Sequence, residues 1–144
     1  YRNILGIKMS VVYVRNFEEW QVAFKRLQTE ADIIIHSGML KGMNNWDSDK
    51  AWTFVLENMK IPVGTVAEPL MCCSVFGLGK NPSEQGRWAA SAALEILDGK
   101  SPSMIPLARN KEGEILVNFD IAEKLDIACD RKILKNARVY QEKE

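Results

Sequence analysis

The sequence has only one histidine, His36, and three cysteines, Cys72, Cys73 and Cys129. A zinc site needs several such ligands at short spacings, and neither a C-x-x-C nor an H-E-x-x-H motif occurs here. An odd cysteine count fits no disulfide framework, and adjacent cysteines rarely bridge each other because the ring that they close is strained. We therefore expect no metal, no cofactor and three small, buried thiols.

Neither sign of charge is in excess, since 19 Lys and Arg side chains balance 19 Asp and Glu side chains. A nucleic acid or an anionic membrane would favour a basic face, so we expect neither as a partner. No apolar run approaches the roughly 18 to 20 residues that cross a bilayer. Hydrophobic residues make up 47% of the 144-residue chain, which is enough for one domain with a buried core.

The glycines Gly77 and Gly79, followed by Lys80, do not complete a phosphate-binding motif. A dinucleotide fingerprint would need a glycine where Pro82 stands, and a Walker loop would need one where Ser74 stands. We expect both glycines to serve backbone turns and to break any regular element.

An enzyme is disfavoured by the residues available. Cys73 and His36 could lie on neighbouring strands, but nothing orients the histidine and no oxyanion donor is implied. A cysteine-dependent enzyme using Cys72 or Cys73 stays the less favoured alternative, which the reactivity of the thiols would decide.

The first hundred residues alternate between strand and helix patterns. We expect a strand at Ile7–Val14, a helix from Phe17 to about residue 30 capped by Asn16, a strand at Ala31–His36, a helix at Ser48–Met59 capped by Asp47, and a strand at Ile61–Thr65. Short joins make each helix carry the chain back across the sheet, so the strands pair in parallel. The prediction is a three-layer α/β/α lobe with a central parallel sheet.

Different patterns follow. We expect a short strand at Cys73–Phe76 and a helix that begins at Asn81 and Pro82 and ends at Gly99. The predicted buried face of this helix consists of Trp88, Ala89, Ala92, Ala93, Ile96 and Leu97. Beyond it we expect a hairpin of Met104–Ala108 with Glu114–Val117, a short helix at about 119–125, and an edge strand at Val139 and Tyr140.

In open parallel sheets, ligands bind outside the carboxyl ends of the strands. The loops at these ends contain the candidate ligand-binding residues Ser37, Asn44, Asn45, Trp46 and Glu68. An aromatic plate beside amide donors, as at Trp46, can orient a small ligand, and Glu68 could pair with a ligand amine. The alternative for Trp46 is a hydrophobic staple on the helix that begins after Asp47.

The C-terminal half carries a specific pattern of short motifs. It reads Glu84-Gln85-Gly86-Arg87, Ala89-Ala90, Ile96-Leu97-Asp98-Gly99-Lys100-Ser101-Pro102, and then Val117-Asn118-Phe119-Asp120-Ile121-Ala122-Glu123-Lys124-Leu125. This pattern resembles the end of the ABC-transporter substrate-binding proteins related to the tryptophan- and tyrosine-binding group. In that family, "E-x-G-R-x-A" opens a helix that ends "I-L-x-G-x-x-P", and an "N-x-x-x-A-x-x-L" helix follows.

The resemblance implies a periplasmic-binding-protein type I architecture, in which two lobes close on a small molecule such as an amino acid. It also implies a periplasmic or extracellular location, possible membrane anchoring through an N-terminal part, and a membrane permease as partner. Residues 1–100 would form lobe two, and residues 101–144 would be a return segment that completes a first lobe. Roughly 140 to 150 residues would then precede Tyr1, and the isolated fragment should self-associate through its exposed interdomain surface.

A sensor is the alternative within the same class of module. The domain would then be fused to a kinase or cyclase, and a membrane-spanning helix after Glu144 would favour this arrangement. The family commonly has "A-G-A" where this chain has Cys72-Cys73-Ser74, so a ligand other than an aromatic amino acid is left open.

Overall fold

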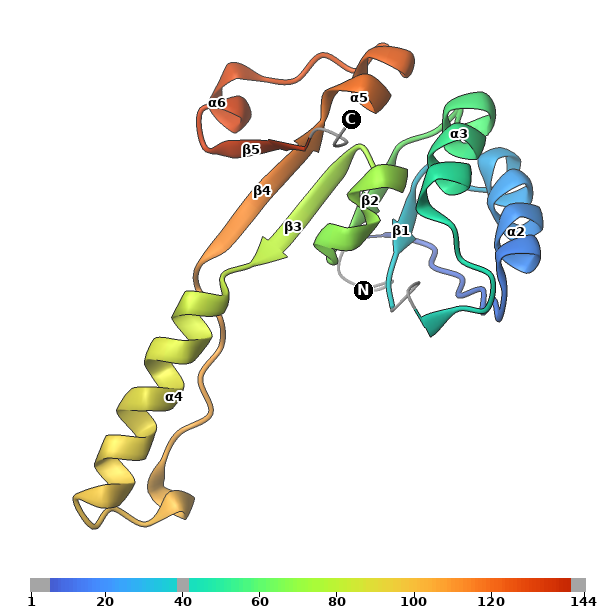
Figure 1. Ribbon diagram of the computed structural model, residues 1–144. Coiled ribbons are helices and arrows are strands. Elements are labelled where there is room, and N and C mark those ends of the chain that lie inside the picture. The colour runs from blue at the N-terminus through green and yellow to red at the C-terminus, as the bar shows by residue number, and fades with distance from the viewer. Residues whose placement is uncertain (1–5, 39–41, 141–144) are drawn as a thin grey trace.

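The computed structural model describes residues 6–38 and 42–140, which fold around a five-stranded sheet (Figure 1). The strands are β1 (Ile34–His36), β2 (Val63–Thr65), β3 (Phe76–Lys80), β4 (Gly113–Asn118) and β5 (Ala137–Tyr140). They lie in the order β1-β2-β3-β4-β5, and every neighbouring pair is parallel except β3 and β4. The predicted α/β class is confirmed, and the central sheet, predicted to be parallel, is mostly parallel because β4 runs antiparallel to β3.

Helices α2 (Phe17–Glu30) and α3 (Ser48–Asn58) lie together beside β1 (Figure 1). Both begin as their sequences predict. The side-chain oxygen of Asn16 accepts a hydrogen bond from the backbone N–H of Glu19 at 2.8 Å, and Asp47 caps α3 in the same way. The carboxylate of Glu19 reaches back to the backbone N–H of Arg15, one residue before the cap.

Aromatic side chains fill the space between these helices and the sheet. Trp20 of α2 is almost fully buried and lies within 5.5 Å, between ring centroids, of both Phe24 and Phe54. The inward residues of the strands, Ile34 and Val63, belong to the same buried cluster. Burial of such large apolar side chains supplies most of the stability of a core.

The strand predicted at Ile7–Val14 is wrong. Residues 6–15 belong to no strand, although residues 7–14 are rich in β-branched side chains; residues 7–11 and Tyr13 are exposed, and Val12 and Val14 are half-buried. A strand needs a partner for its N–H and C=O groups. The nearest pairing in the described chain is an isolated parallel bridge between Asn16 and Asn44.

The third strand also differs from the prediction at Cys73–Phe76. Residues Glu68–Cys73 form a 3-10 helix, η2, and the strand begins at Phe76 and continues through both glycines. A Cβ atom at Gly77 would collide with Sδ of Met71 and lie 3.2 Å from Cβ of Leu116. Gly77 is therefore part of a strand because it lets η2 and β4 approach, and it does not mark a turn.

Helix α4 (Pro82–Leu97) projects away from the sheet together with the chain that returns from it (Figure 1). Its start is as predicted: Asn81 accepts a hydrogen bond from the backbone N–H of Ser83 at 3.0 Å. Its predicted buried face is wrong, since no residue of α4 is buried, and Trp88 and Leu97 expose 42% and 80% of their surface. We call residues 82–112 the arm.

The base of the arm is fastened by polar contacts. The carboxylate of Glu84 accepts hydrogen bonds from the backbone N–H groups of Lys111 and Glu112 at 2.7 and 3.0 Å, and these bonds lower the pKa of Glu84. The carboxylate of Glu112 in turn binds Arg87 and the side chain of Asn81. The start of α4 and the end of the returning segment are thus joined at the point where the arm leaves the sheet.

The predicted hairpin is also wrong. Residues 104–108 contain no strand, and Met104 is the last residue of a short 3-10 helix, η3 (Pro102–Met104). Glu114–Val117 lies in β4 and pairs antiparallel with β3. Helices α5 (Phe119–Lys124) and α6 (Arg131–Leu134) then lead to β5, which is an edge strand as predicted.

Candidate functional site

The carboxyl ends of β1 and β2 lie side by side, because His36 and Thr65 are opposite each other in the parallel register. The hydroxyl of Thr65 lies 3.3 Å from the carbonyl oxygens of His36 and Ala67 and accepts a hydrogen bond from the N–H of Ala67 at 3.0 Å. These bonds set the course of the chain from β2 into η2. They define a polar sheet edge of the kind at which α/β proteins bind ligands.

His36 is the most perturbed titratable group of this edge. The indole N–H of Trp20 donates to its Nε2 at 3.3 Å, and burial lowers the pKa of His36 to about 4. The imidazole is therefore neutral near pH 7, and because Nε2 accepts, Nδ1 carries the proton. Within the part of the chain that the structure describes, this buried Nδ1 has no hydrogen-bond partner.

The loop after β1 places its predicted site residues against α2. The carbonyl oxygen of Asn44 accepts a hydrogen bond from the N–H of Phe17 at 3.3 Å, and Asn45 has a left-handed backbone with φ of 60°. The side chains of Asn44, Asn45 and Ser37 are exposed. They are accessible to a solute, and their role as ligand contacts stays a prediction.

Trp46 has packing contacts of its own. Its ring meets Phe17 and Trp20 edge-on, at 5.6 and 5.2 Å between centroids, and its indole N–H donates to Oγ of Ser48 at 3.2 Å. The residue is half-buried and extends the aromatic cluster of α2 to the sheet edge. Its partners on α2 could not be identified from the sequence, because they depend on how the loop folds back.

Glu68, the remaining predicted site residue, begins η2 and contacts β5, which is the edge strand opposite β1. Its carboxylate accepts a hydrogen bond from Nη2 of Arg138 on β5 at 2.6 Å. Arg138 also donates to Glu114 at 3.0 Å, and the two carboxylates raise its pKa. The described contacts of Glu68 are thus on the β5 side, whereas those of Asn44 and Trp46 are on the α2 side.

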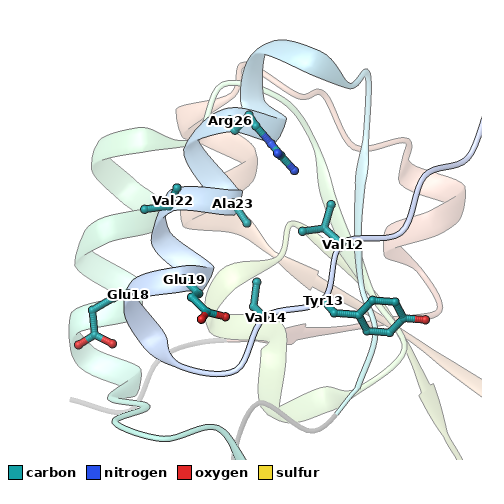
Figure 2. A pocket seen from close by; sticks show the side chains of 8 residues that line it. All are labelled: Val12, Tyr13, Val14, Glu18, Glu19, Val22, Ala23 and Arg26. Atoms are coloured by element: carbon teal, nitrogen blue, oxygen red, sulfur yellow. The ribbon is translucent and has the colours of Figure 1, made fainter.

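A shallow hollow of about 460 Å³ lies between residues 12–14 and α2. Figure 2 shows Tyr13 pointing away from the helix, while Val12 and Ala23 lie on facing sides of the hollow. Glu18, Glu19, Val14, Val22 and Arg26 complete its lining. The sequence did not indicate this hollow because residues 7–14 were expected to pair within the sheet.

Other kinds of site find no support in the described residues. Across residues 6–38 and 42–140, no group of three or more His, Cys, Asp and Glu side chains is placed to hold a metal ion. Among the helices that the structure describes, none has the length and apolar character needed to cross a membrane.

Comparisons with known proteins identify a family for the chain. A family model described as "ABC transporter substrate binding protein" matches residues 1–140. No curated protein sequence matches the chain.

Three solved structures are similar in fold. A ligand-free, open substrate-binding protein with adhesive properties from Clostridium difficile has a TM-score of 0.71 and 21% identity, over 99% of this chain and 47% of its own. A conserved domain protein from Vibrio cholerae has a TM-score of 0.65 and 20% identity, over 96% and 46% of the two chains. An ABC domain from Streptococcus pneumonia in complex with L-Trp has a TM-score of 0.58 and 17% identity, over 88% and 43%. This chain spans less than half the length of each.

Proposed function

Because this chain belongs to the family of ABC transporter substrate-binding proteins, we propose that it captures a small solute outside the cytoplasm and presents it to a membrane permease. The family is extracytoplasmic and its members bind, rather than transform, their ligands. The observation that carries the proposal to this chain is the sheet edge at His36 and Thr65, where two parallel strands end beside exposed polar loops.

The proposal includes a further lobe, the first lobe, that closes over this edge. Three observations support it: the chain spans less than half of each similar structure, the arm has no buried residue in α4, and apolar side chains of α4 such as Trp88 and Leu94 are exposed. An exposed apolar surface of this kind usually marks an interface. We place the segment that contacts the first lobe in the arm, residues 82–112; the division at residue 100 that the sequence suggested stays a prediction.

The ligand that we propose is a small polar molecule such as an amino acid. One similar structure is described as a complex with L-Trp. In this chain, Ser37, Asn44 and Asn45 offer hydroxyl and amide groups, and Trp46 offers an aromatic surface beside them. Glu68 would join this set only by exchanging Arg138 for a ligand amine, since its carboxylate is now bound to the guanidinium.

Lobe closure would make binding measurable. A ligand that contacts both lobes stabilises the closed state by its difference in affinity between the two states. A thermal-shift screen of the full natural chain against amino acids and small polar metabolites should give a rise in Tm that grows with ligand concentration. Absence of a shift with every compound would count against small-solute capture.

Two variants would place the site. Asn44→Ala and Ser37→Ala should reduce the ligand-dependent shift while leaving the Tm of the unliganded protein within a degree or two, because both side chains are exposed. Asn136→Ala is the matched control, since Asn136 is exposed between α6 and β5, away from the loop after β1. If all three substitutions changed the ligand-dependent shift in Tm equally, the loop after β1 would not be the binding site.

A further inference from the structure

The adjacent residues Cys72 and Cys73 at the end of η2 form a pair of thiols whose Sγ atoms lie 3.5 Å apart. Both are almost completely buried, at 2% and 0% exposure, in the same apolar cluster as Val63 and Val75. Neither solute capture nor lobe closure makes use of them. Two thiols held this close can act together on one thiophilic atom.

We propose that Cys72 and Cys73 form a chelating site for trivalent arsenic or antimony compounds. This goes beyond the proposed function, because it concerns the core of the lobe and not the sheet edge. The proposal rests on the spacing of the sulfur atoms, the neutrality of the product, and the lack of a further cluster of metal ligands among the described residues.

The distance between the sulfur atoms sets the bond angle at an atom that bridges them. Bonds of about 2.3 Å to both sulfur atoms, the usual length of a zinc–thiolate bond, would meet across the 3.5 Å separation at an angle of about 100°. Trivalent arsenic has three bonds and a lone pair, so it is pyramidal with angles of this size. A two-coordinate soft cation such as Cu(I) prefers a nearly straight arrangement, which would require the sulfur atoms to separate by more than an ångström.

The surroundings select a neutral product. A zinc ion would need four ligands, and the described residues contain no cluster of three or more His, Cys, Asp and Glu side chains that could supply them. An arsenic atom that bonds to two thiol sulfurs and one organic group carries no net charge. It therefore avoids the cost of placing an unpaired charge in the apolar cluster.

The neighbouring residue offers a possible contact for a hydroxyl-bearing compound. Oγ of Ser74, the next residue along the chain, is buried and has no hydrogen-bond partner among the described residues. A buried hydroxyl without a partner is unusual. Arsenous acid, after reaction with both thiols, would keep one hydroxyl on arsenic close to this residue.

The reaction of an aryl arsenoxide with the pair is balanced without an oxidant. The arsenic–oxygen bond breaks, two arsenic–sulfur bonds form, and the oxygen leaves as water with the two thiol protons. Arsenic stays trivalent and the sulfur atoms are not oxidised. Access requires local opening of η2, which is held by the hydrogen bond from Nδ2 of Asn118 to the carbonyl oxygen of Met71 at 3.0 Å, so the reaction should be slow.

Phenylarsine oxide is the probe for the experiment. The full natural chain is reduced, freed of reductant, and incubated with the arsenoxide both in buffer and in urea below the unfolding transition. It is then unfolded and alkylated with iodoacetamide, and peptide mass spectrometry measures the alkylation of each cysteine. We expect Cys72 and Cys73 to be protected together, Cys129 to be alkylated, and protection to be reversed by 2,3-dimercaptopropanol but not by a monothiol.

Variants test the chelate itself. Cys72→Ala or Cys73→Ala should weaken binding by roughly 100-fold or more, because the second bond is then no longer intramolecular. Cys129→Ala should leave it unchanged. Protection in the unaltered chain gives the answer even where an alanine variant fails to fold. Equal alkylation of all three cysteines under both conditions, or full protection in a single-thiol variant, would overturn the proposal.

Discussion

The indole N–H of Trp20 donates a hydrogen bond to Nε2 of His36 across 3.3 Å, which ties the end of β1 to the first half of α2. Burial keeps the imidazole in its neutral form near pH 7, because it lowers the pKa of His36 to about 4, and the neutral ring has an acceptor to offer the indole. This side-chain pair therefore links the buried aromatic cluster to the sheet edge.

The burial of His36 makes the stability of the fold depend on pH. The pKa of His36 is about 4 in the folded protein, against an ordinary value of 6.5. Between these values the unfolded chain binds a proton that the folded chain does not, so the free energy of unfolding falls as the pH drops from 6.5 to 4. The contribution is fully present above pH 6.5, and about 3 kcal/mol of it is lost by pH 4. Urea titrations across this range would measure it.

His36→Gln is the matched variant for this measurement. Glutamine can accept the hydrogen bond from Trp20 and does not titrate. The difference in the free energy of unfolding between the two proteins therefore reports on His36 alone, without the carboxylates that titrate in a similar pH range. Parallel stability curves for the two proteins from pH 7 to 4 would exclude the assignment to His36.

Gln28 joins α2 to the chain before β2. Its Oε1 accepts hydrogen bonds from the backbone N–H groups of Lys60 and Ile61 at 2.7 and 3.0 Å, and the residue is 5% exposed. Gln28→Ala leaves both donors without this acceptor and should lower the free energy of unfolding by about 2 kcal/mol in urea titrations. Gln21→Ala on the same helix, where the side chain is half-buried, should cost much less; similar costs at both positions would argue against a special role of Gln28.

Glycine-to-alanine substitutions should have opposite signs at two positions. Gly77→Ala would crowd Met71 and Leu116 and should lower the free energy of unfolding by about 1–3 kcal/mol. Gly86→Ala, on the open surface of α4, should raise it by about 0.5–1 kcal/mol, because alanine favours a helix. Calorimetry would compare the two, and adding Met71→Ala should reduce the cost at Gly77. A cost at Gly77 that is unchanged in this background would refute the steric explanation.

The fastening of the arm should be visible in hydrogen exchange. Glu84→Ala removes the acceptor for the backbone N–H groups of Lys111 and Glu112, so both amides should exchange faster while those of β4 keep their protection. Gln85→Ala, an exposed change on the same helical turn, serves as the control. Unaltered exchange at residues 111 and 112 would show that the arm is held by other contacts.

The parts of the fold that were predicted correctly depend on local chemistry. The caps Asn16, Asp47 and Asn81 are read from a few adjacent residues, and each begins a helix in the structure. The wrong parts depend on distant partners. Residues 7–14 are rich in β-branched side chains, as strands are, but pair with no strand in the described chain, and the apolar stripe of α4 shows which face could be buried without showing what covers it.

In the candidate site, too, features set by local sequence were predictable and contacts with distant partners were not. The rule for parallel sheets indicates the edge at which His36 and Thr65 end together in the structure, and ligand binding at this edge stays a prediction. The partners of Trp46 and Glu68 could not be predicted, because α2 and β5 reach them only after the chain has folded back. Contacts of this kind are set by tertiary packing and leave no periodic signal in the sequence.

The arm leaves and rejoins the sheet at one level, because Lys80 and Gly113 are the final register pair of β3 and β4. Two covalent attachments side by side define an axis, as the two leaves of a door hinge do. Rotation of the arm about a line through Lys80 and Gly113 bends β3 and β4 together. Rotation about the axis of β3 or β4 alone would break the hydrogen bonds between these two strands. We therefore expect this connection to bend most easily in one direction, so that the arm would move relative to the sheet mainly along one arc.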